Sequence, residues 1–233
     1  MLKTKRDYEF AFNMIDSWVN QPNINEDWNK LLISIKDTLY QTYKNIKDFT
    51  FTENMLNERM KKYEEIMKPA LNEMDENLKN EFNDYLIKHG FFSGPSSVKY
   101  HGAYPGGNFD HSYSVLEELL NLTNKLGLKW EKERSPYLVG MFHDLCKMPK
   151  YKIKDDMSGY EYTWPYNKEH GLASVEMLNK FFNLTEEEKT CIEFHMGAYE
   201  TSKWDNYDSA IRKYPNVLYV HTADMIASKI RGV

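Results

Sequence analysis

One apolar segment constrains this chain more than any other: residues 136–145 read Pro-Tyr-Leu-Val-Gly-Met-Phe-His-Asp-Leu. Ser135, just before it, suits a helix N-cap, and Pro136 suits the first helical position. Because the segment is apolar nearly all round, we expect a central, buried helix. Its C-terminal end carries two adjacent polar residues, His143 and Asp144. A buried charge is costly unless it is paired or bound to a metal, so this pair predicts a polar site inside the core.

A second predicted helix brings another histidine to the core. It follows a glycine pair, with Asn108 as a suitable N-cap. His111, Val115 and Leu119 recur at intervals of four along it. Residues at this spacing share one face of a helix, so we expect His111 to point inward with its apolar neighbours.

Three more predicted helices each add one such residue. Their starts are marked by Asn167, by a capping box of Thr185 and Glu188, and by Pro215. In that order they carry His170, His195 and Asp224. Converging helices build metal sites from inward side chains, and imidazole together with carboxylate suits divalent first-row metals. Six such residues on core faces are hard to explain as independent buried polar groups.

The adjacency of His143 and Asp144 suggests more than one ion. Successive helix residues differ by about 100° in direction, so one residue can serve one ion while its neighbour bridges to another. Two ions about 3.5–4 Å apart can share a carboxylate and activate water for in-line attack on phosphorus. The pair therefore predicts a dinuclear hydrolytic site.

The order of these residues resembles the signature of the HD-domain metal-dependent phosphohydrolases. The matching text is Gly-Gly-Asn-Phe-Asp-His at residues 106–111, Phe-His-Asp-Leu-Cys-Lys at 142–147 and His-Thr-Ala-Asp at 221–224. The resemblance covers about residues 91–230. It is fairly specific for the fold, an all-α helical bundle, and poorly specific for the substrate.

The same resemblance implies which residues hold metal. The implied ligands of a first ion are His111, His143, Asp144 and Asp224. The implied ligands of a second ion are Asp144, His170 and His195, with Asp144 bridging. The cofactors would be two divalent transition-metal ions, and Fe, Mn, Co, Ni and Zn all stay open.

Two residues close to the His-Asp pair extend the comparison. Lys147 matches the lysine commonly found three positions after the aspartate, where it would meet a substrate phosphate. Asp144 and Lys147 are thus the implied catalytic residues. Cys146 departs from the family pattern, because many members have glycine there. We expect this departure to affect the end of the helix and not the ligands.

The regions around this domain are described more coarsely. Residues 1–90 are polar, charged and periodic, which predicts a helical N-terminal extension of about four helices. Residues 91–233 form the predicted HD domain. Alternating residues on both sides of a Gly-containing turn, at 152–153 and 160–164, predict a small β-hairpin. Two roles stay open for the extension: it caps the site or it forms a homodimer.

Further candidates for substrate binding lie in the glycine-rich stretch before His111. Lys99, His101 and Tyr104 are expected to line the pocket there, although packing in the loop explains each of them as well. The tyrosines of the predicted hairpin suit either stacking on a base or covering the metal site. His221, one turn before Asp224, suits a supporting contact behind the ligands or simple packing.

Composition narrows the partners. The net charge of −5 argues against broad, salt-driven binding to nucleic acid and favours a small nucleotide substrate. No stretch approaches the roughly 20 apolar residues of a membrane span, and the charged start lacks a signal peptide's apolar run. The two cysteines fit a reducing compartment. We therefore expect a cytoplasmic protein with no membrane partner.

Three other functions stay open at this point. Related di-iron oxygenases, which cleave C–C or C–P bonds with O₂, use the same six-ligand set. The Gly-Gly…His text is similar to the HD domains of 3′–5′ exoribonucleases, while the ligand order and intervals resemble the dinucleoside tetraphosphate hydrolases of the superfamily. A binding module that has lost catalysis is the third alternative, and the complete ligand set argues against it.

Overall fold

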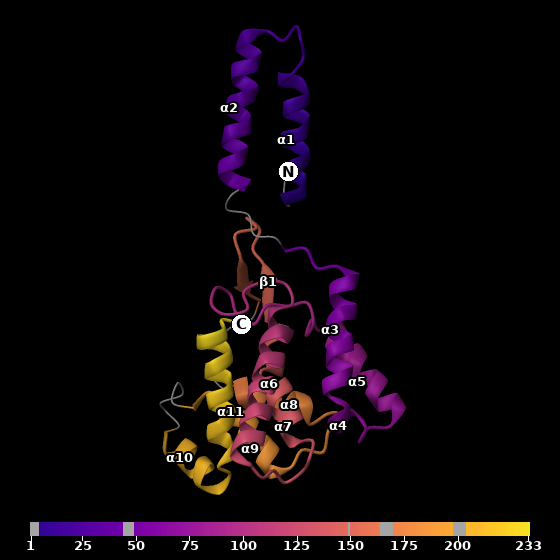
Figure 1. Cartoon of the computed structure of the whole chain (residues 1–233), viewed down its shortest axis with the longest axis vertical. Helices are drawn as coiled ribbons and strands as arrows, with labels where there is room; N and C mark the ends of the chain where they lie inside the picture. The colour runs from indigo at the N-terminus through magenta and orange to yellow at the C-terminus, as the bar shows by residue number, and fades with distance from the viewer. Residues whose placement is uncertain (1–4, 44–48, 149, 164–169, 198–203) are drawn as a thin grey trace. The chain divides into compact units, whose positions relative to one another are not determined.

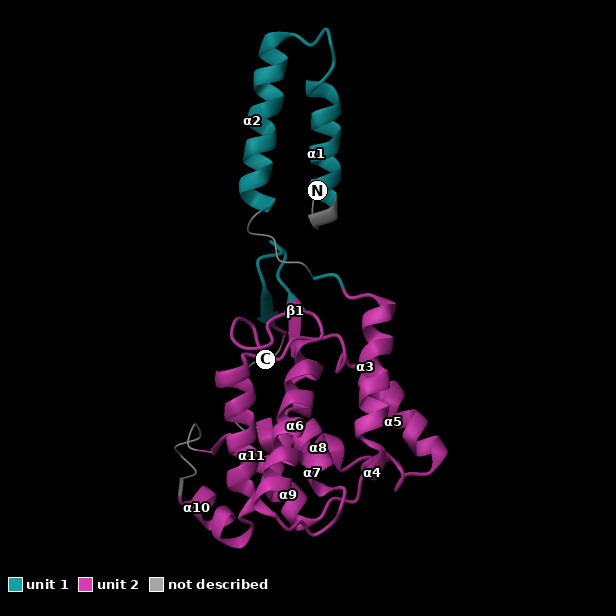
Figure 2. Cartoon of the chain, in the orientation of Figure 1, with its two compact units in different colours: residues 1–50, 153–161 teal, residues 51–152, 162–233 magenta. Residues whose placement is uncertain are grey.

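The computed structural model describes residues 5–43, 49–148, 150–163, 170–197 and 204–233. It is all-α apart from one two-stranded hairpin, which confirms the predicted fold class. Contacts divide the chain into two compact units (Figure 2). The first comprises residues 1–50 and 153–161, and the second comprises residues 51–152 and 162–233. The domain boundary near residue 90, inferred from composition, stays a prediction.

The first unit contains a pair of antiparallel helices, α1 (Lys5–Val19) and α2 (Glu26–Tyr43), which lie side by side (Figure 1). The Asn25 side chain accepts a hydrogen bond from the Asp27 amide at 2.8 Å and so caps α2. The seam between the helices is narrow, with Ile15 and Leu32 among its few buried apolar residues. A pair of this size buries little apolar surface by itself.

The second unit begins with three helices and holds most of the core. The first three are α3 (Glu53–Ile66), the single-turn α4 (Lys68–Leu71) and α5 (Glu76–Lys88). Five helices therefore precede residue 90, where about four were predicted. Buried rings on α3 and α5 pack against those of the central helices: Tyr63 and Phe82 lie 6.3 and 5.3 Å from the Phe142 ring.

The central helices of this unit are the ones predicted to carry polar core residues. They are α6 (Gly107–Leu126), α7 (Ser135–Phe142), α8 (His170–Leu178), α9 (Glu186–Glu193) and α11 (Asn216–Met225). Shorter elements complete the unit: the 3-10 turn η1 (Leu145–Lys147), α10 (Trp204–Lys213) and the π-helix η4 (Ile226–Arg231). The α6 helix packs along both α7 and α11 in the middle of the unit (Figure 1).

The N-caps of α6 and α7 differ from the prediction. The cap of α6 is Gly106 at φ 87°, not Asn108, because the chain enters the helix through a left-handed turn that glycine adopts most easily. Asn108 lies inside the first turn, and its amide donates to the Gly94 carbonyl at 3.0 Å. Ser135 is the first residue of α7 and not its cap, since its hydroxyl donates to Glu188 instead. The capping box at the start of α9 is confirmed.

The predicted hairpin is confirmed as β1 (Tyr151–Ile153) and β2 (Tyr160–Tyr162). The Tyr151 hydroxyl donates to the Ser96 carbonyl at 3.1 Å, which ties the base of the hairpin to the glycine-rich loop. None of the helices in the described residues is long and apolar enough to span a membrane.

Candidate metal centre

All six polar residues singled out in the sequence lie close together in the second unit, although five separate segments supply them. His111 comes from the first turns of α6, and His143 and Asp144 follow the last residue of α7. His170 is the first residue of α8, whereas Asn167, the predicted start, lies outside the described residues. Asp224 lies near the end of α11. His195 was predicted on α9 but lies just beyond its end, because α9 stops at Glu193.

The first group of donor atoms surrounds one carboxylate oxygen of Asp144. The Nε2 atoms of His111 and His143 lie 3.6 and 3.3 Å from Asp144 Oδ2 and 3.4 Å from each other. Asp224 Oδ1 lies 3.3 Å from the Nε2 of His111. All four side chains are almost fully buried.

The second group surrounds the other oxygen of the same carboxylate. The Nε2 atoms of His170 and His195 lie 3.5 and 3.4 Å from Asp144 Oδ1 and 3.2 Å from each other. Asp144 therefore stands between two histidine pairs and offers one oxygen to each.

Backbone carbonyls fix the tautomers of three of these histidines. The Nδ1 atoms of His111, His143 and His195 lie 2.9, 3.0 and 2.6 Å from the carbonyl oxygens of Val233, Gly140 and Ile192. A carbonyl only accepts, so each Nδ1 donates its hydrogen there and the neutral ring presents a lone pair at Nε2. Metal-binding histidines are oriented in this way. Two lone pairs facing each other, as at His111 and His143, repel unless a cation or a proton lies between them.

These distances fit shared metal ions. Two ligand atoms about 2.1 Å from one ion and about 90–110° apart lie about 3.0–3.4 Å from each other. Asp144 Oδ1 is moreover buried and has no hydrogen-bond partner. A buried carboxylate oxygen without a partner is costly, and a cation would satisfy it. The donor set is therefore chemically suited to two divalent ions.

The electrostatics of the cluster are strongly perturbed. Burial by itself raises the pKa of Asp144, but the charges of Lys147 and His143 hold it well below the ordinary value. Burial likewise opposes charge on His111, yet hydrogen bonds to Asp144 and Asp224 raise its pKa to about 9. Burial lowers the pKa of His170 to about 3, with the neighbouring His195 adding to the effect. Such opposed shifts among close groups are typical of functional sites.

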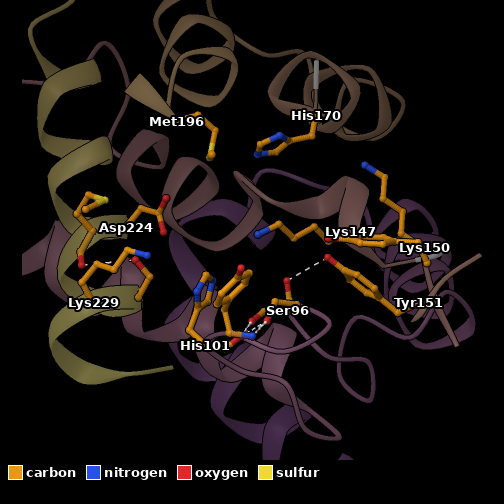
Figure 3. Close-up of a pocket in the computed structure, with 14 residues that line it drawn as sticks. Ser96, His101, Lys147, Lys150, Tyr151, His170, Met196, Asp224 and Lys229 are labelled. Carbon is orange, nitrogen blue, oxygen red and sulfur yellow. Dashed lines mark hydrogen bonds between the residues drawn. The ribbon is translucent and has the colours of Figure 1, made fainter. Parts of the chain in front are cut away.

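A pocket of about 310 Å³ opens onto this cluster (Figure 3). Its lining includes two of the cluster residues, His170 and Asp224. Lys147 points into the space between them (Figure 3), and its Nζ lies 2.5 Å from Asp144 Oδ2. The predicted lysine is thus within reach of both the carboxylate and a molecule in the pocket.

Of the three other predicted pocket residues, only His101 lines it. Its ring centroid lies 4.7 Å from that of His111. Lys99 and Tyr104 are not part of the lining. Lys99 places its Nζ over the Tyr100 ring at 5.1 Å, and Tyr104 hydrogen-bonds with Asp110. The loop turns these two side chains elsewhere.

Several lining residues were missed from the sequence. They are Ser96, Ser97, Tyr100, Lys150, Tyr151, Met196, Met225, Ser228 and Lys229. A signal existed for two of them, because Lys150 follows Lys147 by one helical turn and Lys229 lies one turn beyond Met225. Tyr162 of the hairpin also lines the pocket, whereas Trp164 and Tyr166 lie outside the described residues.

Cys146 and His221 have supporting positions. Cys146 is buried in η1, and its amide donates to the Ser174 hydroxyl at 3.2 Å, which holds the turn after Asp144 against α8. His221 Nδ1 lies 2.8 Å from the backbone carbonyl of His195 and donates to it. Both contacts orient the segments that carry cluster residues.

Gly171 is expected to be essential for the placement of His170. A Cβ at this position would lie 2.3 Å from the Glu193 carbonyl oxygen, so α8 and α9 meet backbone to backbone here. We expect Gly171→Ala to separate the helices, to destabilise the fold by about 1–3 kcal/mol and to lower the metal content. Denaturant titration and elemental analysis test this, with the exposed Glu176→Ala on the same helix as control. Unchanged metal content would show that this contact does not position His170.

Comparison with known families yields one match. The family model described as HD domain matches residues 108–228, which include all six cluster residues. No curated protein and no solved structure matches the chain.

Proposed function

Since the chain belongs to the HD domain family, a superfamily of metal-dependent hydrolases, we propose that it cleaves a phosphoester or phosphoanhydride bond of a small, nucleotide-type substrate. The observation that carries this proposal is the Asp144 carboxylate, whose two oxygens face two separate histidine pairs. A monohydrolytic site with one ion would need only one of these pairs.

Two ions would be held by residues already close together. His111, His143 and Asp224 would hold one, His170 and His195 the other, and Asp144 would bridge. Such ions would lower the pKa of water and polarise phosphoryl oxygens. The backbone carbonyls behind the histidines keep the Nε2 atoms directed at the centre, so little reorganisation is needed when substrate binds.

The charge of the pocket supports a phosphorylated substrate. Lys147, Lys150 and Lys229 all line it. Within the described part of the chain, Lys150 and Lys229 make no ion pair; Lys150 donates to Cys146 Sγ at 3.3 Å. Lysines without a carboxylate partner beside a metal cluster are available to bind anionic phosphoryl oxygens.

The aromatic lining favours a nucleotide over a simple phosphate ester. Tyr100, Tyr151 and Tyr162 border the pocket, and the rings of Tyr151 and Tyr162 lie 5.3 Å apart. Flat aromatic faces stack on bases of any sequence. The hydrogen bond from Tyr151 to the Ser96 carbonyl holds one of these rings in place.

Assays on a nucleotide panel test the proposal. With Mn²⁺, Fe²⁺ or Co²⁺ added, we expect release of phosphate or of a shorter nucleotide from one class of mono-, di- or dinucleoside polyphosphates. Oxygen consumption without hydrolysis would replace the proposal with a di-iron oxygenase. Degradation of single-stranded RNA from its 3′ end, with no turnover of small nucleotides, would replace it with an exoribonuclease.

Removal of one pocket lysine gives a more specific prediction. Lys150→Ala is expected to raise KM by about tenfold, because a hydrogen bond to a charged phosphate is worth about 1.5–3 kcal/mol. The matched control is Lys125→Ala at the exposed C-terminal turn of α6, which should leave KM unchanged. Steady-state kinetics on the nucleotide identified by the panel measure both. Equal KM values for the two variants would remove Lys150 from the phosphate-binding group.

A further inference from the structure

The hairpin of α1 and α2 carries large apolar side chains on its outside. Phe10, Met14 and Trp18 follow one another at i, i+4 and i+8 along α1, and all three are exposed. Residues at this spacing form one stripe on a helix. The buried residues of α1, Tyr8 and Ile15, lie on a different side, toward α2.

A second stripe follows α2. Trp28, Leu31 and Ile35 stand at i, i+3 and i+7, and all three are exposed. The buried Leu32 faces α1 instead. The periodicity that predicted this helix from Leu31 and Ile35 is therefore confirmed, but the two side chains do not enter the seam between the helices.

The two stripes lie on the same side of the hairpin. Helical directions of about 100° per residue, applied to an antiparallel pair with Ile15 and Leu32 in the seam, turn both stripes the same way. The polar links between the helices mark the opposite side: Lys36 pairs with Asp16 at 2.5 Å, and Tyr43 donates to Glu9 at 3.0 Å. We call the six residues the hairpin apolar face: Phe10, Met14, Trp18, Trp28, Leu31 and Ile35.

We propose that the hairpin apolar face binds the same face of a second copy of this chain, so that two hairpins form a four-helix bundle. Two antiparallel helices have one seam, whereas four have a closed core. A two-fold axis matches a face with itself, so one apolar surface suffices for both partners. The ion pairs of the hairpin, Lys36–Asp16 and Lys30–Glu26, lie away from this face. Two copies therefore meet there without opposing those charges.

The area of the face agrees with what a dimer needs. Large side chains bury about 150–250 Å² each, and the six residues together leave about half of their surface exposed. That is about 600 Å² per copy and about 1,200 Å² for the pair. Stable protein interfaces begin at about this size. An apolar face of this extent on one copy alone is uncommon in monomeric proteins.

A matched pair of variants on α2 tests the proposal. Leu31 and Ile33 have the same exposure, 48% each, but Ile33 lies about 200° away around the helix, on the side of the Lys36–Asp16 pair. We expect Leu31→Glu to weaken dimerisation of the full chain by at least about 100-fold, because a carboxylate would be buried without a partner. Ile33→Glu should leave the dimer intact. Sedimentation velocity over a concentration series measures both.

Circular dichroism and metal content establish that each variant is folded. If Leu31→Glu loses helical signal, Trp28→Asn and Leu31→Asn replace it. The proposal is supported by a dimeric wild type that Leu31→Glu or these replacements dissociate and Ile33→Glu does not. A wild type that sediments as a monomer at every concentration overturns it. A dimer that both glutamate variants weaken equally, or that neither affects, overturns it too, because the interface would then lie elsewhere.

Discussion

Asp144→Ala is expected to remove bound metal and to lower hydrolytic turnover by about a thousandfold or more while the helices remain folded. The carboxylate contributes one oxygen to each histidine pair, at 3.3 Å from His143 and 3.4 Å from His195. Its loss takes a ligand from both groups at once. Elemental analysis, phosphate release and circular dichroism of the purified variant measure the three quantities.

The control is an aspartate of the same unit with no part in the cluster. Asp84→Ala on the exposed side of α5 should keep metal content and turnover. Asp144→Asn separates charge from shape, since the amide fills the same space but binds cations poorly. Full turnover of Asp144→Ala with metal retained would show that this residue does not bridge.

Arg134→Met is expected to lower the free energy of unfolding by about 3–5 kcal/mol, the largest stability effect we foresee. The buried guanidinium donates to Glu188 at 3.1 and 3.3 Å, to Glu73 at 2.7 Å and to the Asn183 carbonyl at 2.7 Å. Glu188 also accepts from the Ser135 hydroxyl at 2.9 Å. Methionine would leave this carboxylate buried without its cation, and such an unpaired charge is strongly destabilising.

Urea denaturation measures the effect. Arg212→Met on α10 is the matched control, because Arg212 also pairs with a carboxylate, Asp208 at 2.8 Å, but does so in solvent. No measurable change is expected there. Equal midpoints for the two variants would mean that the Arg134 network contributes no more than a surface pair.

Local signals in the sequence predict much of this fold. The Thr185–Glu188 capping box and Pro215 mark the starts of α9 and α11 correctly, because capping depends on adjacent residues only. The candidate cluster is predictable for a related reason. Histidine and aspartate on apolar faces have few uses apart from pairing or metal binding, so their order along the helices already indicates that they converge.

Other features depend on contacts between distant segments. Gly106 and not Asn108 caps α6, because a left-handed turn is needed there, and Ser135 donates to Glu188 from a separate helix. Lys229 borders the pocket only because η4 follows Asp224 toward it. For Leu31, the periodicity of α2 predicts the helix equally well whichever stripe faces α1. No local pattern in the sequence decides such choices.

The most direct test of the dinuclear centre is the metal content of the full chain, purified without oxygen and analysed for Fe, Mn, Co, Ni and Zn. We predict close to two ions per chain in the wild type and a loss of both in Asp144→Ala. One ion per chain, retained when His170 and His195 are replaced by alanine, would contradict the second group of ligands and with it the bridging role of Asp144.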